Sequence, residues 1–218
     1  MIIADNIIKD RIKNVYFIWG RGKTTIANEL NRKFGYHIYD VDASRYRHMK
    51  SANPKYQPYM CRDFVKEYGV KSFWALPPEV INERELHLLH EFTPMVIMDL
   101  ILLASEHDVI ICEGDIEYDA VIPVASHTVH LSNCGTRFDW FNRPDHIATL
   151  DSIKNRTDLT EKEKEDIIKN AYDSVGQEEG EIPDWVIKHG IKNIEWNDRT
   201  SIEQTTLEVS QYFKLPYS

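Results

Sequence analysis

The chain has 218 residues, of which 42% are hydrophobic and 28% charged, and these proportions indicate a folded domain rather than a fibre or a disordered tail. The net charge of -9 argues against a general affinity for nucleic acid or an anionic membrane, because both partners require clustered Lys and Arg. The cysteines Cys61, Cys112 and Cys134 form no C-x-x-C pair, so neither a disulfide framework nor a four-thiolate zinc site is expected.

The location expected from the sequence is the cytoplasm. The first six residues contain no basic region followed by a long apolar run, so they do not form a secretory signal. The longest apolar run, Val96–Ala104, is interrupted by Asp99 and is shorter than the roughly 20 residues that a membrane span needs. We therefore expect this run to be a buried helix, and the protein to have no membrane partner.

The first elements in chain order form a βαβ unit. Val15–Trp19 is a continuous apolar run that ends at a glycine, as expected of a strand buried on both faces. Thr24–Phe34 has apolar residues at spacings of four, which predicts a helix, and Gly35 follows as its left-handed C-terminal cap. Tyr36–Val41 is the next predicted strand, and the crossover makes the two strands parallel.

The same alternation continues to the C-terminus. Thr93 and Pro94 are typical of an N-cap and a first helical residue, so we expect a helix from there to about Ala104. Capping-box patterns predict two further helices, which begin near Thr160 and Thr200. The second of these would bury Ile202, Val209 and Phe213. The remaining predicted strands are Val109–Cys112, Thr128–Leu131 and Ile191–Trp196.

Together these elements predict an α/β fold with about five parallel strands and helices on both faces. We expect a single domain over residues 1–218. Two stretches interrupt the alternation, residues 43–84 and residues 132–146, and such excursions at strand ends are where α/β domains usually contact substrates.

The strongest chemical signal lies between the first strand and the first helix, in Gly20-Arg21-Gly22-Lys23-Thr24-Thr25. Backbone N–H groups of a glycine-rich loop and a helix N-terminus bind phosphate, and a lysine neutralises the phosphate oxygens. In the P-loop pattern G-x-x-x-x-G-K-[ST], the residue after the lysine contacts Mg²⁺, and here this residue is Thr24. A turn with solvated charges is the alternative for the short motif.

The spacing of this motif departs from the P-loop pattern. Four residues should separate the two glycines, but only Arg21 separates Gly20 from Gly22. The loop is shortened, or Phe17 replaces the first glycine, or three residues are missing from the chain. Placing the loop start at Phe17 would break the predicted strand, so our hypothesis is a missing segment.

The motif and its surroundings resemble the P-loop kinases of small molecules and nucleotides, the group of adenylate, shikimate and gluconate kinases and chloramphenicol phosphotransferase. The resemblance covers most of the chain in architecture, whereas the specific motifs are confined to short stretches. It implies a three-layer P-loop fold, ATP and Mg²⁺ as cofactors, an acceptor-binding insertion at residues 43–84 and a lid-like segment at residues 132–146.

Carboxylates follow two of the predicted strands. The resemblance implies that Asp40 or Asp42 orients or deprotonates the acceptor hydroxyl, and we favour Asp42 because it lies further from the strand. A helix N-cap is the alternative for Asp42. Glu113 matches the strand-end carboxylate that acts near the metal, with a solvent-facing strand end as its alternative, and we expect Asp115 to cap the next helix.

Cationic residues occur in both interrupting stretches. By resemblance, Arg137 and Arg143 are lid arginines that stabilise the charge of the transferred phosphoryl group. Arg45 and Arg47 are candidates to bind a small polar or phosphorylated acceptor. Each of these arginines has a solvated surface charge as its alternative.

The last loop, with Asn197 and Asp198, resembles the segment that packs on adenine in this group, and a turn with a helix cap is its alternative. The predicted nucleotide-binding residues are therefore Gly20, Arg21, Gly22, Lys23, Thr24, Thr25, Asn197 and Asp198.

The function expected from the sequence is an ATP- and Mg²⁺-dependent kinase. It would transfer the γ-phosphoryl group to a hydroxyl or phosphate of a small molecule, with Lys23, Asp42, Arg137 and Arg143 as catalytic residues. The alternative is a nucleotide-binding sensor or scaffold with little turnover, which a truly shortened loop would favour. A nucleic-acid kinase is disfavoured by the acidic charge, and a monomer or homodimer is expected.

Overall fold

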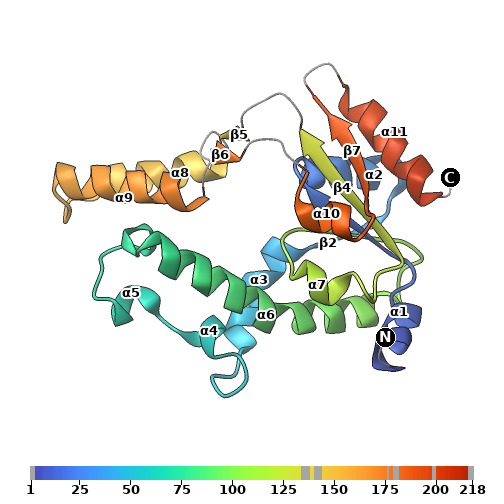
Figure 1. Ribbon diagram of the computed structural model, residues 1–218, viewed down its shortest axis with the longest axis horizontal. Coiled ribbons are helices and arrows are strands. Elements are labelled where there is room, and N and C mark those ends of the chain that lie inside the picture. Colours follow the sequence, from blue (N-terminus) through green and yellow to red (C-terminus); the bar gives the residue numbers. More distant parts are fainter. Residues whose placement is uncertain are drawn as a thin grey trace.

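A computed structural model describes residues 3–133, 138–139, 144–175, 177–178, 182–197 and 200–215. Its centre is a five-stranded, all-parallel sheet in the order β2-β3-β1-β4-β7, with helices on both faces (Figure 1). A separate pair of short antiparallel strands, β5 and β6, lies outside this sheet. The strands are β1 (Val15–Gly20), β2 (His37–Asp40), β3 (Ile110–Glu113), β4 (His127–Asn133), β5 (Phe138–Asp139), β6 (Gln177–Glu178) and β7 (Lys192–Trp196).

The central strands are apolar on both faces, and this composition explains their position. Successive side chains of a strand point to opposite faces, so Phe17 packs in one core cluster and Ile18 in the other. In β3, Cys112 lies in the first cluster and Ile111 in the second. All five predicted strands are present within one or two residues of their expected bounds.

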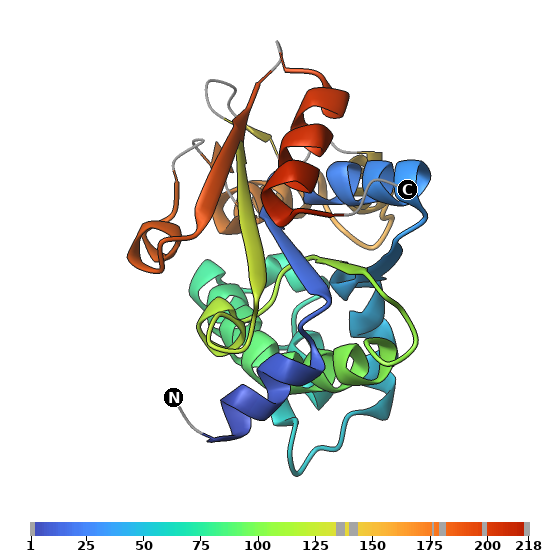
Figure 2. The ribbon, with the colours of Figure 1, turned by 90° about the vertical axis from the view of Figure 1, so that its right-hand side faces the viewer.

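Two groups of helices cover the sheet, on opposite sides (Figures 1 and 2). One side carries α1 (Ile3–Arg11), α3 (Val41–Ser51), α6 (Pro78–Leu103), α7 (Tyr118–Val121) and α10 (Asp184–Lys188). The other side carries α2 (Lys23–Phe34) and α11 (Ile202–Phe213). The predicted α/β architecture is therefore confirmed.

Short helical segments and a helical hairpin extend the domain away from the sheet (Figure 1). The segments α4 (Pro58–Cys61), α5 (Phe64–Glu67) and η1 (Phe73–Ala75) connect α3 to α6. The hairpin of α8 (Pro144–Lys154) and α9 (Glu161–Val175) packs on η1 through Trp74. Residues 43–84, the first of the two stretches that interrupt the predicted alternation, are therefore mostly helical. Residues 43–51 of this stretch belong to α3 and residues 78–84 to α6.

The predicted start of a helix at Thr93 and Pro94 is wrong. These residues lie inside α6, which begins at Pro78. A proline inside a helix removes one backbone hydrogen bond, but the apolar residues Leu88, Phe92, Val96 and Leu100 continue one buried face through it. Their burial outweighs the lost bond. The hydroxyl of Thr93, instead of capping the helix, accepts a hydrogen bond from the backbone N–H of Glu117 at 3.0 Å.

The helix caps follow the sequence more closely. Gly35 ends α2 with φ of 70°, and the Thr160 and Glu163 pair opens α9 as expected. In α11 the N-cap is Ser201, whose capping box is completed by Gln204. Ile202 is 51% exposed, so the prediction that it joins Val209 and Phe213 in the core is wrong.

By length and composition, α6 is the one described helix that meets the requirements for crossing a membrane. Its residues at four-residue spacing from Leu88 to Leu100 are fully buried against the sheet and its covering elements. One face of α6 therefore packs in the first core cluster, whereas Leu86, Met98 and Leu102 on the same helix are exposed.

We expect the Leu100→Ala substitution to lower the free energy of unfolding by about 2–5 kcal/mol, because the side chain is fully buried and leaves a cavity. Leu102→Ala on the same helix is the control. Leu102 is 62% exposed, so its replacement should change stability by no more than about 0.5 kcal/mol. Urea unfolding of both variants measures the difference, and equal losses would contradict the packing of α6 described above.

Candidate functional site

A turn of only two residues connects β1 to α2. The strand ends at Gly20, the helix begins at Lys23, and Arg21 and Gly22 lie between them in a continuous chain. The hypothesis of a missing segment is therefore wrong: the full sequence has no gap here, and the loop is genuinely short.

Both glycines of the turn are required by its geometry. Gly20 has φ of 85°, and a Cβ atom there would lie 2.1 Å from the Leu131 carbonyl oxygen. Gly22 has φ of 81°, and a Cβ atom there would lie 2.9 Å from the Trp196 ring. Left-handed backbone is unfavourable for residues with a side chain. The turn therefore lies tightly against β4 and the end of β7.

Two hydrogen bonds fix the residue between the glycines. The Arg21 backbone N–H donates to the Leu131 carbonyl at 2.9 Å, and the Trp196 indole N–H donates to the Arg21 carbonyl at 2.9 Å. The peptide groups of the turn are thus used to attach it to the sheet. They do not form the wide loop that a full P-loop spacing would supply.

The N-terminus of α2 is available to an anion. Its N-cap is Gly22, whose position supplies no side-chain hydrogen bond to the helix. The first N–H groups of a helix have no partner within the helix, and they carry partial positive charge. Lys23, Thr24 and Thr25 form this first turn, so the predicted phosphate-binding residues stand together there.

Carboxylates from β2 and β3 lie beside this helix terminus, because parallel strands end at the same edge of the sheet. Asp40 and Glu113 are direct partners in the β2–β3 register. Glu113 is 3% exposed and accepts a hydrogen bond from the Thr24 hydroxyl at 2.8 Å. The structure therefore brings together Thr24 and Glu113, the two residues predicted to act at the metal.

Asp115 lies in the site and not at a helix terminus. Its carboxylate is 3.2 Å from the Lys23 ammonium nitrogen, whereas the residue at the N-cap of α7 is Glu117. The prediction that Asp115 caps the next helix is wrong. The ion pair with Lys23 prevails, since it offers a full opposite charge to a partly buried ammonium group.

Asp40 and Asp42 have different positions at the start of α3. Asp40 is the N-cap residue, and its carboxylate accepts a hydrogen bond from the Ala43 backbone N–H at 2.8 Å. Asp42 lies in the first turn of α3, where its charge interacts with that of Lys23. The capping role considered for Asp42 therefore belongs to Asp40.

Gly114 allows β3 and α3 to approach closely. It has φ of 127°, and a Cβ atom there would lie 2.5 Å from the Cβ atom of Val41. A side chain at this position would push the start of α3 away from the end of β3. The close approach keeps the carboxylates that follow the two strands in one cluster, which we call the carboxylate cluster: Asp40, Asp42, Glu113 and Asp115.

The pKa values of the site reflect this crowding. Burial raises the pKa of Glu113 to about 7, and the charge of Asp40 adds to the effect. Loss of hydration followed by the charge of Asp115 raises the pKa of Asp42, although the side chain retains contact with solvent. Burial alone would lower the pKa of Lys23, but the charges of Asp115, Asp42 and Glu113 outweigh it and raise the pKa.

The oxygen ligands of the site suit Mg²⁺, but they do not form a complete metal centre. Over the described ranges, no three His, Cys, Asp or Glu side chains are arranged to hold a metal ion. Mg²⁺ binds through one or two carboxylates and keeps water and phosphate oxygens as its other ligands. The hydroxyl of Thr24 and the carboxylate of Glu113 fit that incomplete set.

The predicted acceptor-binding arginines lie on different sides of α3. Arg45 is one turn after Asp42, and it donates a hydrogen bond to Glu85 of α6 at 3.1 Å. Arg47 contacts the Asp99 carboxylate, which also accepts a hydrogen bond from the Tyr39 hydroxyl at 2.7 Å. Arg47 therefore takes part in a contact between α3 and α6 instead of the carboxylate cluster.

The remaining predicted residues belong to the lid and to the last loop. Asn197 follows β7, and its backbone N–H and carbonyl form hydrogen bonds with Thr200 in a turn. Arg137, Arg143 and Asp198 lie outside the described residues.

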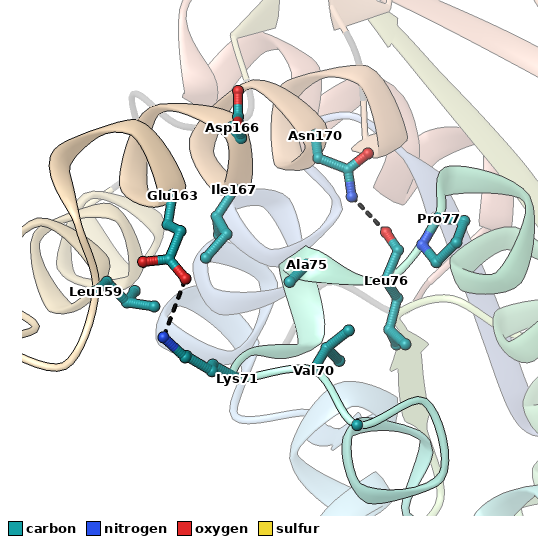
Figure 3. A pocket seen from close by; sticks show the side chains of 11 residues that line it. Val70, Lys71, Ala75, Leu76, Pro77, Leu159, Glu163, Asp166, Ile167 and Asn170 are labelled. Atoms are coloured by element: carbon teal, nitrogen blue, oxygen red, sulfur yellow. Dashed lines mark hydrogen bonds and ion pairs between the residues drawn. The ribbon is translucent and has the colours of Figure 1, made fainter.

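A hollow of about 540 Å³ lies apart from the carboxylate cluster, between α9 and residues 69–77 (Figure 3). Its wall is mainly apolar, and an ion pair of 3.0 Å between Lys71 and Glu163 crosses one end. None of the lining residues belongs to the carboxylate cluster or to the first turn of α2.

Comparisons with known proteins establish no family. No protein-family model matches the chain, and no curated protein matches it. Among solved structures, the chain is similar to a dephospho-CoA kinase from Campylobacter jejuni, with a TM-score of 0.45 and 12% identity over 91% of this chain and 96% of that one. It is also similar to a sugar kinase from a Janibacter species, with a TM-score of 0.39 and 14% identity over 93% and 95% of the two chains. Similarity at this level establishes neither a shared fold nor a shared activity.

We expect the free energy of unfolding to decrease as the pH rises from about 4.5 to about 7. The Glu113 carboxyl has a pKa of about 7 in the folded protein against 4.5 ordinarily, so the folded state binds more protons across this range. The loss should be on the order of 3 kcal/mol.

Urea unfolding without divalent cations at pH 5 and pH 7.5 measures this effect. In Glu113→Gln the decrease should be much smaller. The control is Glu208→Gln, since the Glu208 side chain is 53% exposed and should leave the decrease unchanged. A wild-type decrease no larger than that of Glu113→Gln would contradict the burial of this carboxyl group.

Proposed function

We propose that the protein is an ATP- and Mg²⁺-dependent phosphotransferase that acts on a hydroxyl or phosphate group of a small molecule. The observation that carries this proposal is the position of Lys23, in the uncapped first turn of α2 and beside the carboxylate cluster. A lysine and a helix N-terminus attract phosphate, whereas several carboxylates repel it. Thr24 and Glu113 would hold a divalent cation, and its positive charge would offset the repulsion between the phosphate and the carboxylates.

In the proposed reaction, each group of the site has a separate role. Lys23 neutralises phosphate oxygens, and its raised pKa keeps the ammonium group charged at neutral pH. Thr24 and Glu113 hold Mg²⁺, which when bound supplies positive charge to the phosphoryl oxygens. Asp42 accepts the proton of the acceptor hydroxyl, and its raised pKa makes it a stronger base than an ordinary aspartate.

The short turn favours one alternative, a nucleotide-binding sensor or scaffold with little turnover. A full P-loop surrounds the β-phosphate with backbone N–H groups, whereas here the Arg21 N–H is bonded to Leu131. Fewer donors are left to stabilise the transferring group. Tight ATP binding without acceptor-stimulated release of ADP, in a panel of nucleosides, sugars, polyols and aminocyclitols, would favour this alternative.

We expect Lys23→Ala to weaken binding of ATP in the presence of Mg²⁺ by about 10- to 100-fold, because a hydrogen bond to a charged group contributes about 1.5–3 kcal/mol. Isothermal titration calorimetry measures the affinity. Lys33→Ala, in the last turn of the same helix and paired with Glu29, is the control and should bind ATP as the wild type does. Equal affinity of the wild type and Lys23→Ala would show that this turn does not bind the phosphates.

We expect Asp42→Asn to reduce kcat by about 10²- to 10⁴-fold, the usual contribution of a positioned general base, and to leave the affinity for ATP unchanged. The measurement is acceptor-stimulated release of ADP with the most active compound of the panel. Asp173→Asn, an exposed position on α9, serves as the control. Unchanged turnover in Asp42→Asn would exclude this residue as the base and leave the phosphate-binding role of Lys23 intact.

A further inference from the structure

Two arginines share one carboxylate at the contact between α3 and α6. Glu85 accepts a hydrogen bond from Arg45 at 3.1 Å through one oxygen, and its other oxygen contacts the guanidinium group of Arg84. Counted together, these three groups have one positive charge in excess. Their side chains are mostly removed from solvent, with 15% of Arg84 and 24% of Arg45 exposed.

One of the two arginines also has a hydrogen-bond donor without a partner. The Nε atom of Arg45 is buried and has no hydrogen-bond partner among the described residues. Buried polar groups without a partner are uncommon, because each one loses its hydration without compensation. Burial lowers the pKa of Arg84, the charge of Glu85 opposes this effect, and the neighbouring charge of Arg45 adds to it. An additional anion at this point would satisfy both the donor and the charge.

Aromatic rings hold the two guanidinium groups in place. Arg45 lies over the ring of Phe92 at 5.9 Å, and Arg84 lies over that of Phe73 at 5.0 Å. Guanidinium groups positioned in this way lose little freedom when they bind a ligand, and their planar shape suits the paired oxygens of carboxylate and phosphate. The arrangement is therefore organised before any ligand arrives.

Arg45, one member of this arginine pair, stands one helical turn from the proposed base. Asp42 and Arg45 are three residues apart on α3, a spacing that puts their Cβ atoms roughly 5–6 Å apart on one face of a helix. The charge of Arg45 also lowers the pKa of Asp42 against the stronger effects of burial and Asp115. The two groups are thus close enough for the charge of one to affect the other.

We infer that Arg45 and Arg84 bind an anionic group of the acceptor, so that the acceptor is a small hydroxy compound with a carboxylate or phosphate close to the reacting hydroxyl. This inference rests on the proposed phosphotransferase function. It assigns Arg84, on which no sequence motif falls, to substrate specificity.

Binding of inorganic phosphate to the Lys23→Ala protein tests the anion site without turnover and without the phosphate-binding turn of α2. Adding Arg84→Gln should weaken phosphate binding at least tenfold, because the excess positive charge is lost. Adding Glu85→Gln should strengthen it, because the competing carboxylate is removed. Adding Arg32→Gln, which removes an exposed charge paired with Glu29, should have no effect.

The opposite directions expected for Arg84→Gln and Glu85→Gln separate a binding role from a structural one, since damage to the fold would weaken binding in both. Thermal unfolding establishes whether each variant is folded. If Arg84→Gln does not fold, the phosphate affinity of Glu85→Gln alone tests the inference. Absence of phosphate binding in the Lys23→Ala protein, or phosphate binding unchanged by both substitutions, would overturn the inference.

Turnover of matched compounds by the wild-type protein tests the acceptor class. We expect glycerol 3-phosphate to exceed glycerol, or 4-hydroxybutyrate to exceed 1,4-butanediol, by at least tenfold in kcat/KM for ADP release. The first pair tests whether a phosphate group on the acceptor raises kcat/KM, and the second pair tests the same for a carboxylate group. Equal activity with charged and neutral compounds would overturn the inference while phosphotransfer stands. A different outcome would refute the proposed function and leave the anion site standing. In that outcome the protein binds no ATP, but Arg84→Gln still abolishes the binding of inorganic phosphate.

Discussion

The two-residue turn between β1 and α2 determines the geometry of the site. Because Gly20 and Gly22 both adopt left-handed backbone against neighbouring strands, α2 begins at a fixed point beside the ends of β1 and β3. Lys23 and Thr24 then reach the carboxylates of Asp115 and Glu113 directly. A longer loop would hold more backbone donors, but it would not be tied in the same way to the sheet.

The charges of the site form an alternating series from α2 to α6. The positive charges of Lys23 and Arg45 both act to lower the pKa of Asp42. Arg45 also forms an ion pair with Glu85, and Glu85 forms a second ion pair with Arg84. Each of these charges has a neighbour of opposite sign, which offsets part of the cost of its removal from solvent. The first member faces the proposed phosphate donor and the last ones face the proposed acceptor.

The sheet and the central loop could be predicted from the sequence because their signals are local. Apolar runs predicted β1 and β3, the other three strands were expected from the alternation of elements, and the Gly20–Thr25 motif pointed to the candidate site. The start of α6 was missed because a proline is ordinarily an N-terminal signal, and burial of an extended apolar face overrode it. Asp115, Arg84 and Glu85 were not predicted as site residues, since their roles arise from contacts between segments far apart in the chain.

The bond between Trp196 and Arg21 joins residues 175 positions apart, and this separation has a consequence for the order of folding. Contacts between distant residues form late, because a long loop must close before they are made. The turn is also bonded to β4, which lies between β1 and β7 in the sheet. The turn between β1 and α2 therefore has all of its contacts only when β7, the last strand in the chain, has been added to the sheet.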